Sequence, residues 1–128
     1  MQSGDCPCSG RTLSRQVRPA VLAILANGEE HGYRIVQRLA ELRLFGEAHT
    51  PDPSGLYRAL KQMETEGLVV STWDRQGTGP DRRLFSLTAA GLDCLGRWVD
   101  TLTEHAAGLS ELIGVMRDAV AQSGGNEP

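Results

Sequence analysis

The stretch PDPSGLYRALKQMETEGLV, residues 51–69, predicts one helix with two contrasting faces. Pro53 suits a first helical turn, and Gly67 suits a C-terminal stop. At about 100° per residue, one face gathers the apolar side chains Leu56, Ala59, Leu60 and Met63. The opposite face carries hydroxyls and cations and no acid: Ser54, Arg58, Lys61 and Thr65. One face therefore belongs in a core, and the other is available to an anionic partner.

Composition predicts a single globular domain in the cytoplasm. The chain has 128 residues with a hydrophobic share of 40%, both ordinary for one soluble domain. No apolar run approaches the roughly 20 residues of a membrane span. The polar start, MQSGDCPCSG, has no visible secretory signal. Three cysteines form an odd count that argues against a closed disulfide framework and for a reducing compartment.

Charge is unevenly distributed along the chain. The formal net charge is −3, yet residues 1–88 hold 11 Lys and Arg against 10 Asp and Glu. Residues 89–128 hold 2 and 6. An acidic total does not exclude nucleic acid, because binding responds to a local patch. It does argue against a nonspecific polycation.

The segments on either side of this helix predict the rest of the fold. Upstream, RQVRPAVLAILANG reads as a buried helix with inward Val21, Leu22, Ile24 and Leu25. HGYRIVQRLAELRLFG reads as a second helix with inward Val36, Leu39 and Ala40. Downstream, two β-prone runs, Leu68–Trp73 and Arg83–Leu87, flank a Gly- and Pro-containing turn and predict a hairpin. The predicted fold is mainly α with a small β-hairpin, in the order of a winged helix-turn-helix.

A long last helix follows, capped by Thr88. Its apolar residues step by three and four through four heptads: Leu92, Leu95, Val99, Leu102, Ala106, Leu109, Ile113, Met116 and Val120. This seam favours a partner helix, and the alternative is packing back onto its own domain. The predicted organisation is a flexible Cys-containing leader (1–11), a winged helix-turn-helix DNA-binding domain (12–88), a C-terminal dimerisation helix (89–122) and a flexible tail (123–128).

The outer face of the third helix and the hairpin tip are the candidate DNA contacts. Cations and hydroxyls pair with guanine edges and phosphates when such a helix enters the major groove. Arginines on a wing contact phosphates or the minor groove, although Asp74 and Asp81 neutralise part of that charge. The alternatives are a solvated helix face and a charged, soluble turn. The predicted DNA-binding residues are Tyr33, Ser54, Tyr57, Arg58, Lys61, Gln62, Thr65, Arg75, Arg82 and Arg83.

The chain resembles the PadR family of bacterial transcriptional regulators over roughly residues 17–120. The resemblance rests on AVLAILANGEEHGYRIVQRL, GLYRALKQMETEGLV, GPDRRLFSLTAAG and the long helix after them. It implies homodimeric, operator-binding repression, relieved by a small molecule or a stress signal. In some members an aromatic residue on the last helix lines a drug pocket between subunits. Trp98 is the candidate here, with interface packing as its alternative. A second reading of the chain is a dimeric winged-helix protein-interaction module without operator binding.

Other candidate chemistry is sparse. Cys6 and Cys8 could offer two thiolates to a soft metal or an oxidant, but no third ligand lies nearby in sequence. The alternative is a leader with incidental thiols, and no metal or cofactor is expected. His31 is interpreted as a polar residue at a helix start rather than a metal ligand. Because the sequence holds no G-x-S-x-G, H-E-x-x-H or phosphate-binding loop, an enzyme is not expected.

Overall fold

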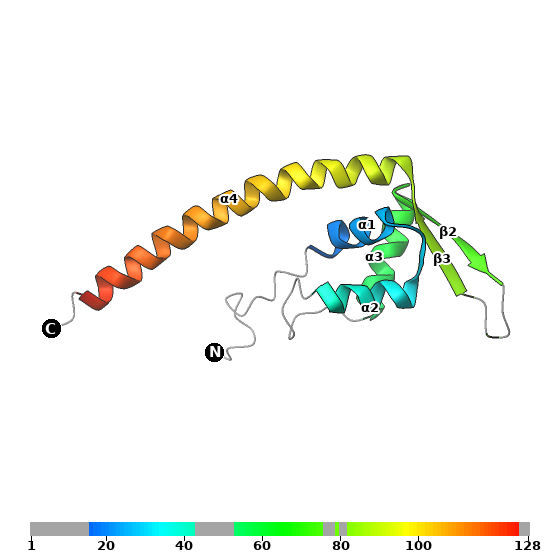
Figure 1. Cartoon of the computed structure of the whole chain (residues 1–128), viewed down its shortest axis with the longest axis horizontal. Coiled ribbons are helices and arrows are strands. Elements are labelled where there is room, and N and C mark those ends of the chain that lie inside the picture. The colour runs from blue at the N-terminus through cyan, green and yellow to red at the C-terminus, as the bar shows by residue number, and fades with distance from the viewer. Residues whose placement is uncertain (1–15, 43–52, 76–78, 80–81, 126–128) are drawn as a thin grey trace. The chain divides into compact units, whose positions relative to one another are not determined.

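A computed structural model describes residues 16–42, 53–75, 79 and 82–125. Two compact units make up the chain, Met1–Leu95 and Gly96–Pro128. In chain order the elements are α1 (Val17–Ala26), β1 (Glu30–His31), α2 (Gly32–Leu42), α3 (Pro53–Thr65), β2 (Val69–Asp74), β3 (Arg82–Leu87) and α4 (Ala89–Gly125) (Figure 1). The predicted leader, with Cys6 and Cys8, lies outside the described residues.

The core of the first unit forms where α1, α2 and α3 meet the sheet. The predicted inward residues of α1 are all buried, and α3 buries Leu56, Leu60 and Met63 as predicted. In α2, however, the buried residues are Gly32, Ile35 and Leu39. Leu39 was predicted to face inward, but Ala40 is exposed and Val36 only half-buried, so the expectation was wrong at these two positions. The pair four residues apart, Ile35 and Leu39, sets the face instead.

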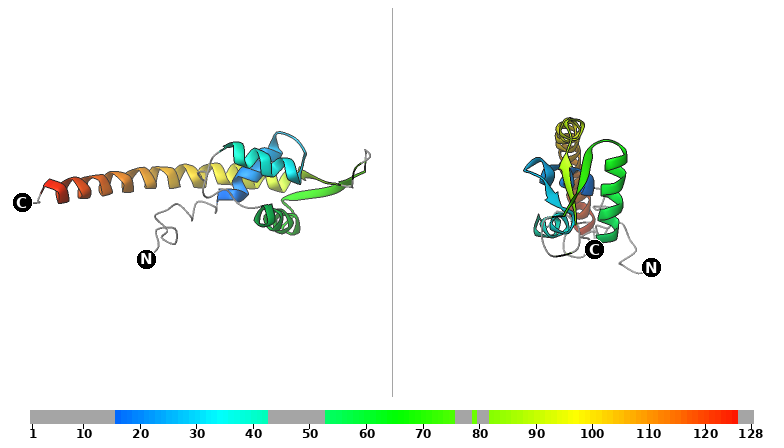
Figure 2. Two further views of the ribbon diagram at one scale, coloured as in Figure 1. Left: turned by 90° about the horizontal axis from the view of Figure 1, so that it is seen from below. Right: turned by 90° about the vertical axis from the view of Figure 1, so that its right-hand side faces the viewer.

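The sheet has three strands in the order β1-β3-β2, all paired antiparallel. The predicted hairpin is confirmed, with a register running from Val69 opposite Leu87 to Asp74 opposite Arg82. It projects from the three helices of the first unit (Figure 1 and Figure 2). The third strand, β1, was not predicted. It is only two residues long, a Glu and a His, and exists because β3 offers a free edge.

Two glycines fix how α3 ends and α4 begins. Gly67 has a positive φ of 81°. The Gly67 N–H donates to the Glu64 carbonyl (3.0 Å) and the Leu68 N–H to the Met63 carbonyl (2.9 Å), a pairing that satisfies the last carbonyls of a helix. The N–H of Gly91 donates to Thr88 Oγ1 at 3.0 Å, so Thr88 caps α4 as predicted. A Cβ on Gly91 would clash with the Leu68 carbonyl oxygen.

α4 extends beyond the predicted end at 122 and remains helical through Gly125. The part from Gly96 onward forms the second unit. Large apolar side chains along it are exposed, from 43% for Ile113 to 73% for Val120. Although α4 has 37 residues, no helix within the described ranges combines the length and apolarity that a membrane crossing requires.

Candidate nucleic-acid interface

The outer face of α3 presents a continuous polar surface. Burial of Leu56, Leu60 and Met63 on one side turns the other side to solvent. All six residues predicted there are exposed: Ser54, Tyr57, Arg58, Lys61, Gln62 and Thr65. The Thr65 hydroxyl donates to the Lys61 carbonyl at 3.1 Å, which leaves its lone pairs available to a donor. The helical periodicity therefore assembles the predicted surface.

The two cations of this face differ from most described cations of the first unit. The side chains of Arg58 and Lys61 form no hydrogen bond or ion pair with any other residue that the structure describes. By contrast, Arg18 pairs with Glu66 at 2.6 Å, and Arg38 lies 3.7 Å from Glu30. A cation without an internal partner keeps its full charge available to a phosphate.

Tyr57 is seated on the backbone of Gly32, at the start of α2. A Cβ on Gly32 would lie 2.5 Å from Tyr57 Cε1, so a larger residue there would force the tyrosine ring to shift. The ring is 44% exposed and forms part of the outer face of α3.

One face of the hairpin groups Tyr33 with Arg82. The Arg82 guanidinium lies 5.1 Å from the Tyr33 ring centroid and donates to its hydroxyl at 3.1 Å. Tyr33 also stacks on His31, with centroids 5.7 Å apart. His31 Nε2 lies 2.8 Å from Asp74 Oδ2. Tyr33 is 42% exposed, so part of it is accessible from solvent.

The other face of the hairpin holds Arg83 in internal contacts. Its guanidinium donates to Ser71 Oγ from Nε (3.1 Å) and Nη2 (2.6 Å), and lies 5.1 Å from the Trp73 ring centroid. Glu64 of α3 is 3.6 Å away. Sequence reasoning missed Glu64, Ser71 and Trp73. The pairing of Trp73 with Arg83 across the two strands could have indicated these contacts, but it can be seen only once the hairpin register is known. Arg75 is described and exposed, whereas Asp81 lies outside the described residues.

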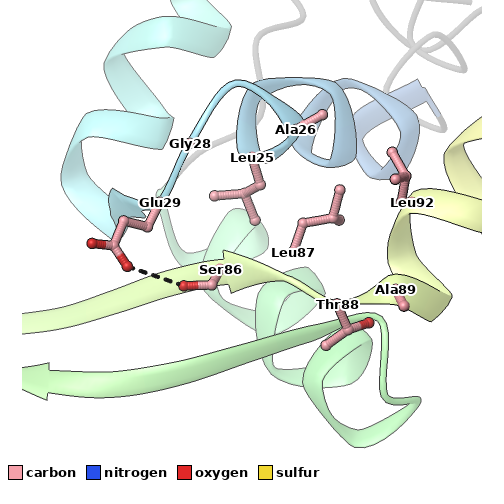
Figure 3. Close-up of a pocket in the computed structure, with 9 residues that line it drawn as sticks. All are labelled: Leu25, Ala26, Gly28, Glu29, Ser86, Leu87, Thr88, Ala89 and Leu92. Atoms are coloured by element: carbon pink, nitrogen blue, oxygen red, sulfur yellow. Dashed lines mark hydrogen bonds between the residues drawn. The ribbon is translucent and has the colours of Figure 1, made fainter.

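A shallow pocket of about 460 Å³ lies where α1 ends, β3 ends and α4 begins. Figure 3 shows side chains of Leu25, Leu87 and Leu92 on its walls. At its rim, Ser86 Oγ donates to the Glu29 carboxylate at 3.3 Å. Trp98, the predicted effector residue, does not line this pocket. Over the described ranges, no three His, Cys, Asp or Glu side chains are grouped to hold a metal ion.

This architecture matches a known family. Residues 21–97 match the model of the "Transcriptional regulator PadR-like family". The chain belongs to the PadR-like family. PadR-like proteins are transcriptional regulators, which agrees with the expectation that this chain is not an enzyme. The winged helix-turn-helix fold with a long C-terminal helix is likewise confirmed.

A curated PadR relative is the negative transcriptional regulator PadR of Bacillus subtilis. It is 29% identical over 85 residues, which are 66% of this chain and 46% of the relative. This chain therefore spans about half the length of that protein. The crystal structure of Bacillus subtilis PadR in complex with operator DNA is similar with a TM-score of 0.58 and 29% identity. The match covers 67% of this chain and 48% of that one.

Other solved structures support the fold alone. A PadR family regulator from Clostridium difficile has a TM-score of 0.65 at 22% identity, over 77% of this chain and 98% of that one. A transcriptional regulator from Clostridium thermocellum has a TM-score of 0.69 at 18% identity, over 78% and 96%. The high coverage of the Clostridium difficile structure shows that the arrangement of helices and hairpin is that of a PadR family regulator.

Proposed function

We propose that this PadR-like regulator is a homodimeric, sequence-specific DNA-binding repressor. The observation that carries the proposal is the pair of exposed cations on α3, Arg58 and Lys61, which have no partner within the described residues. They lie opposite the buried Leu56 and Leu60, where a helix in the major groove meets base edges. The named activity of the Bacillus subtilis relative, negative regulation, supports repression.

DNA recognition divides between α3 and the hairpin. In the proposal, Arg58 and Lys61 contact guanine edges or phosphates, and the neighbouring polar residues of α3 complete the contact. The hairpin acts as the wing. The wing cations meet the phosphate backbone together with the Tyr33 hydroxyl. These cations are Arg75, Arg82 and Arg83. Contacts to phosphate position the protein, and contacts to bases specify the sequence.

In the proposal, α4 forms the dimer interface. Its seam, from Leu92 to Val120, exposes apolar side chains such as Leu109 (44%) and Met116 (50%) to water. Burial against a second α4 would remove this surface from water at about 25 cal/mol per Å². A symmetric dimer would also hold two half-sites of an operator together. Relief by a small molecule is part of the proposal, with Trp98 on α4 as the contact.

The first test is a selection of genomic DNA. Purified protein is mixed with sheared genomic DNA, and the retained fragments are sequenced. The proposal predicts a small set of enriched fragments whose affinity falls steeply with salt, because phosphate binding releases counterions. No enrichment and no salt dependence would instead favour the protein-interaction module, a reading that the near-balanced charge of residues 1–88 also suits.

A further inference from the structure

Glu64 lies at the C-terminal end of α3, the helix proposed to enter DNA, and faces the hairpin. Its Oε2 accepts hydrogen bonds from the Ser71 backbone N–H (3.0 Å) and from Ser71 Oγ (2.7 Å). Its Oε1 lies 3.6 Å from Arg83 Nη2. A carboxylate that approaches phosphates would oppose binding by its charge. Its position on this helix therefore calls for a reason.

Ser71 connects Glu64 to Arg83. Its hydroxyl donates to Glu64 and accepts from two guanidinium nitrogens of Arg83, at 3.1 and 2.6 Å. The three side chains thus join α3, β2 and β3. We call Glu64, Ser71 and Arg83 the wing brace. Each bond in it involves an ionised group, which makes it stronger than a neutral hydrogen bond, and the Ser71–Glu64 bonds are partly buried.

We propose that Glu64 is a positioning residue for DNA binding, which acts through the wing brace by fixing the hairpin against α3. This inference rests on the proposed DNA-binding function. α3 and the wing must meet the same duplex at once, so the angle between them decides whether both sets of contacts form together. A wing that moves freely loses part of its binding free energy to ordering.

The neighbouring Glu66 supplies a contrast on the same helix end. It pairs with Arg18 of α1 at 2.6 Å, with both side chains more than a third exposed. That pair does not reach the hairpin. Exposed pairs of this kind contribute little. Glu64 and Glu66 carry the same charge. Comparing the two alanine variants therefore separates the effect of the lost charge from the effect of the residue's position.

The experiment compares Glu64→Ala with Glu66→Ala, using the most enriched fragment of the genomic selection as the duplex at one salt concentration. Alanine preserves helix propensity at position 64, and position 66 follows the last residue of α3. We expect Glu64→Ala to weaken binding about tenfold, because hydrogen bonds to a charged group are lost. We expect Glu66→Ala to stay within about twofold of wild type or to bind more tightly. Equal or tighter binding by Glu64→Ala would overturn the positioning role.

Ser71→Ala removes brace bonds without changing any charge. We expect weaker binding from this variant as well, and partial or full recovery from Ser71→Thr, which keeps a hydroxyl. The double variant Glu64→Ala/Ser71→Ala should bind no more weakly than Glu64→Ala alone, since the brace is already broken. Independent, multiplying losses would contradict a shared network. Unchanged melting temperatures would exclude global unfolding as the cause.

Hydrogen exchange separates the brace from the proposed function. β2 is an edge strand, and the Ser71 N–H donates to Glu64. We expect this amide to exchange about tenfold faster in Glu64→Ala, with the core amides of α1 unchanged. Unaltered Ser71 exchange would show that the brace does not form. If wild type binds no duplex, the positioning role fails with the proposed function. If wild type binds and Glu64→Ala binds equally well, the positioning role alone fails.

Discussion

α3 and α4 each carry an apolar face, but among the residues that the structure describes only the face of α3 is covered. Leu56, Leu60 and Met63 of α3 are at most 1% exposed. The apolar residues of α4 in the second unit, such as Ile113 and Val120, remain 43% and 73% exposed. The difference indicates two uses of amphipathicity. In the proposed function, α3 uses its covered face for stability and presents its polar face to DNA, whereas α4 offers its apolar face to a second copy of the chain.

The largest expected effect is on the covered face. Leu60 is fully buried, so Leu60→Asp loses its burial and places a charge in the core, at a cost comparable to the whole stability of a domain. We expect the first unit to unfold, as measured by circular dichroism. Val120→Asp is the matched control on α4 and should leave the secondary structure of the first unit intact. A folded Leu60→Asp protein would contradict the assignment of the α3 core face.

The uncovered face is tested by Leu102→Glu. In a symmetric dimer the change occurs twice, and each buried leucine contributes about 1.5–3 kcal/mol. We expect a largely monomeric protein with weakened operator binding, although every proposed DNA contact is intact. Thr101→Glu, one residue away and off the heptad seam, should remain dimeric in sedimentation velocity. A dimeric Leu102→Glu protein would move the interface to another surface.

Two glycines of α4 sharpen the comparison further. A Cβ on Gly91 would clash with the Leu68 backbone, whereas a Cβ on Gly108 would meet nothing within 4 Å. We expect Gly91→Ala to destabilise the first unit by about 1–3 kcal/mol. Gly108→Ala should stabilise the helix by up to about 1 kcal/mol. Thermal unfolding of both variants measures the difference. Equal melting temperatures would show that Gly91 is not packed as described.

The last pair of variants concerns the affinity for DNA rather than the stability of the fold. Arg58→Ala and Lys61→Ala should each weaken specific DNA binding by about 1–3 kcal/mol and leave the melting temperature unchanged. Arg38→Ala, which removes a cation already near Glu30, is the charge-matched control and should bind nearly as wild type does. Unchanged affinity in both α3 variants would remove α3 from the interface.

Local patterns predicted the buried residues of α1 and the buried face of α3, because positions three and four apart in one helix decide them. Contacts between residues far apart in the sequence could not be predicted from these local patterns. β1 exists only by pairing with β3, and His31 meets Asp74 from 43 positions away. The sequence likewise grouped Arg83 with the other wing cations. Its contacts with Ser71 and Glu64 depend on a hairpin register that side-chain alternation alone does not determine.

Sedimentation velocity of the wild-type protein, alone and with the most enriched duplex, tests the central claim most directly. The claim is that the exposed face of α4 is covered by a second copy while two α3 helices bind one DNA. We predict a dimer at micromolar concentration and a complex of two chains per duplex. A monomer alone, or one chain per duplex at saturation, would contradict it.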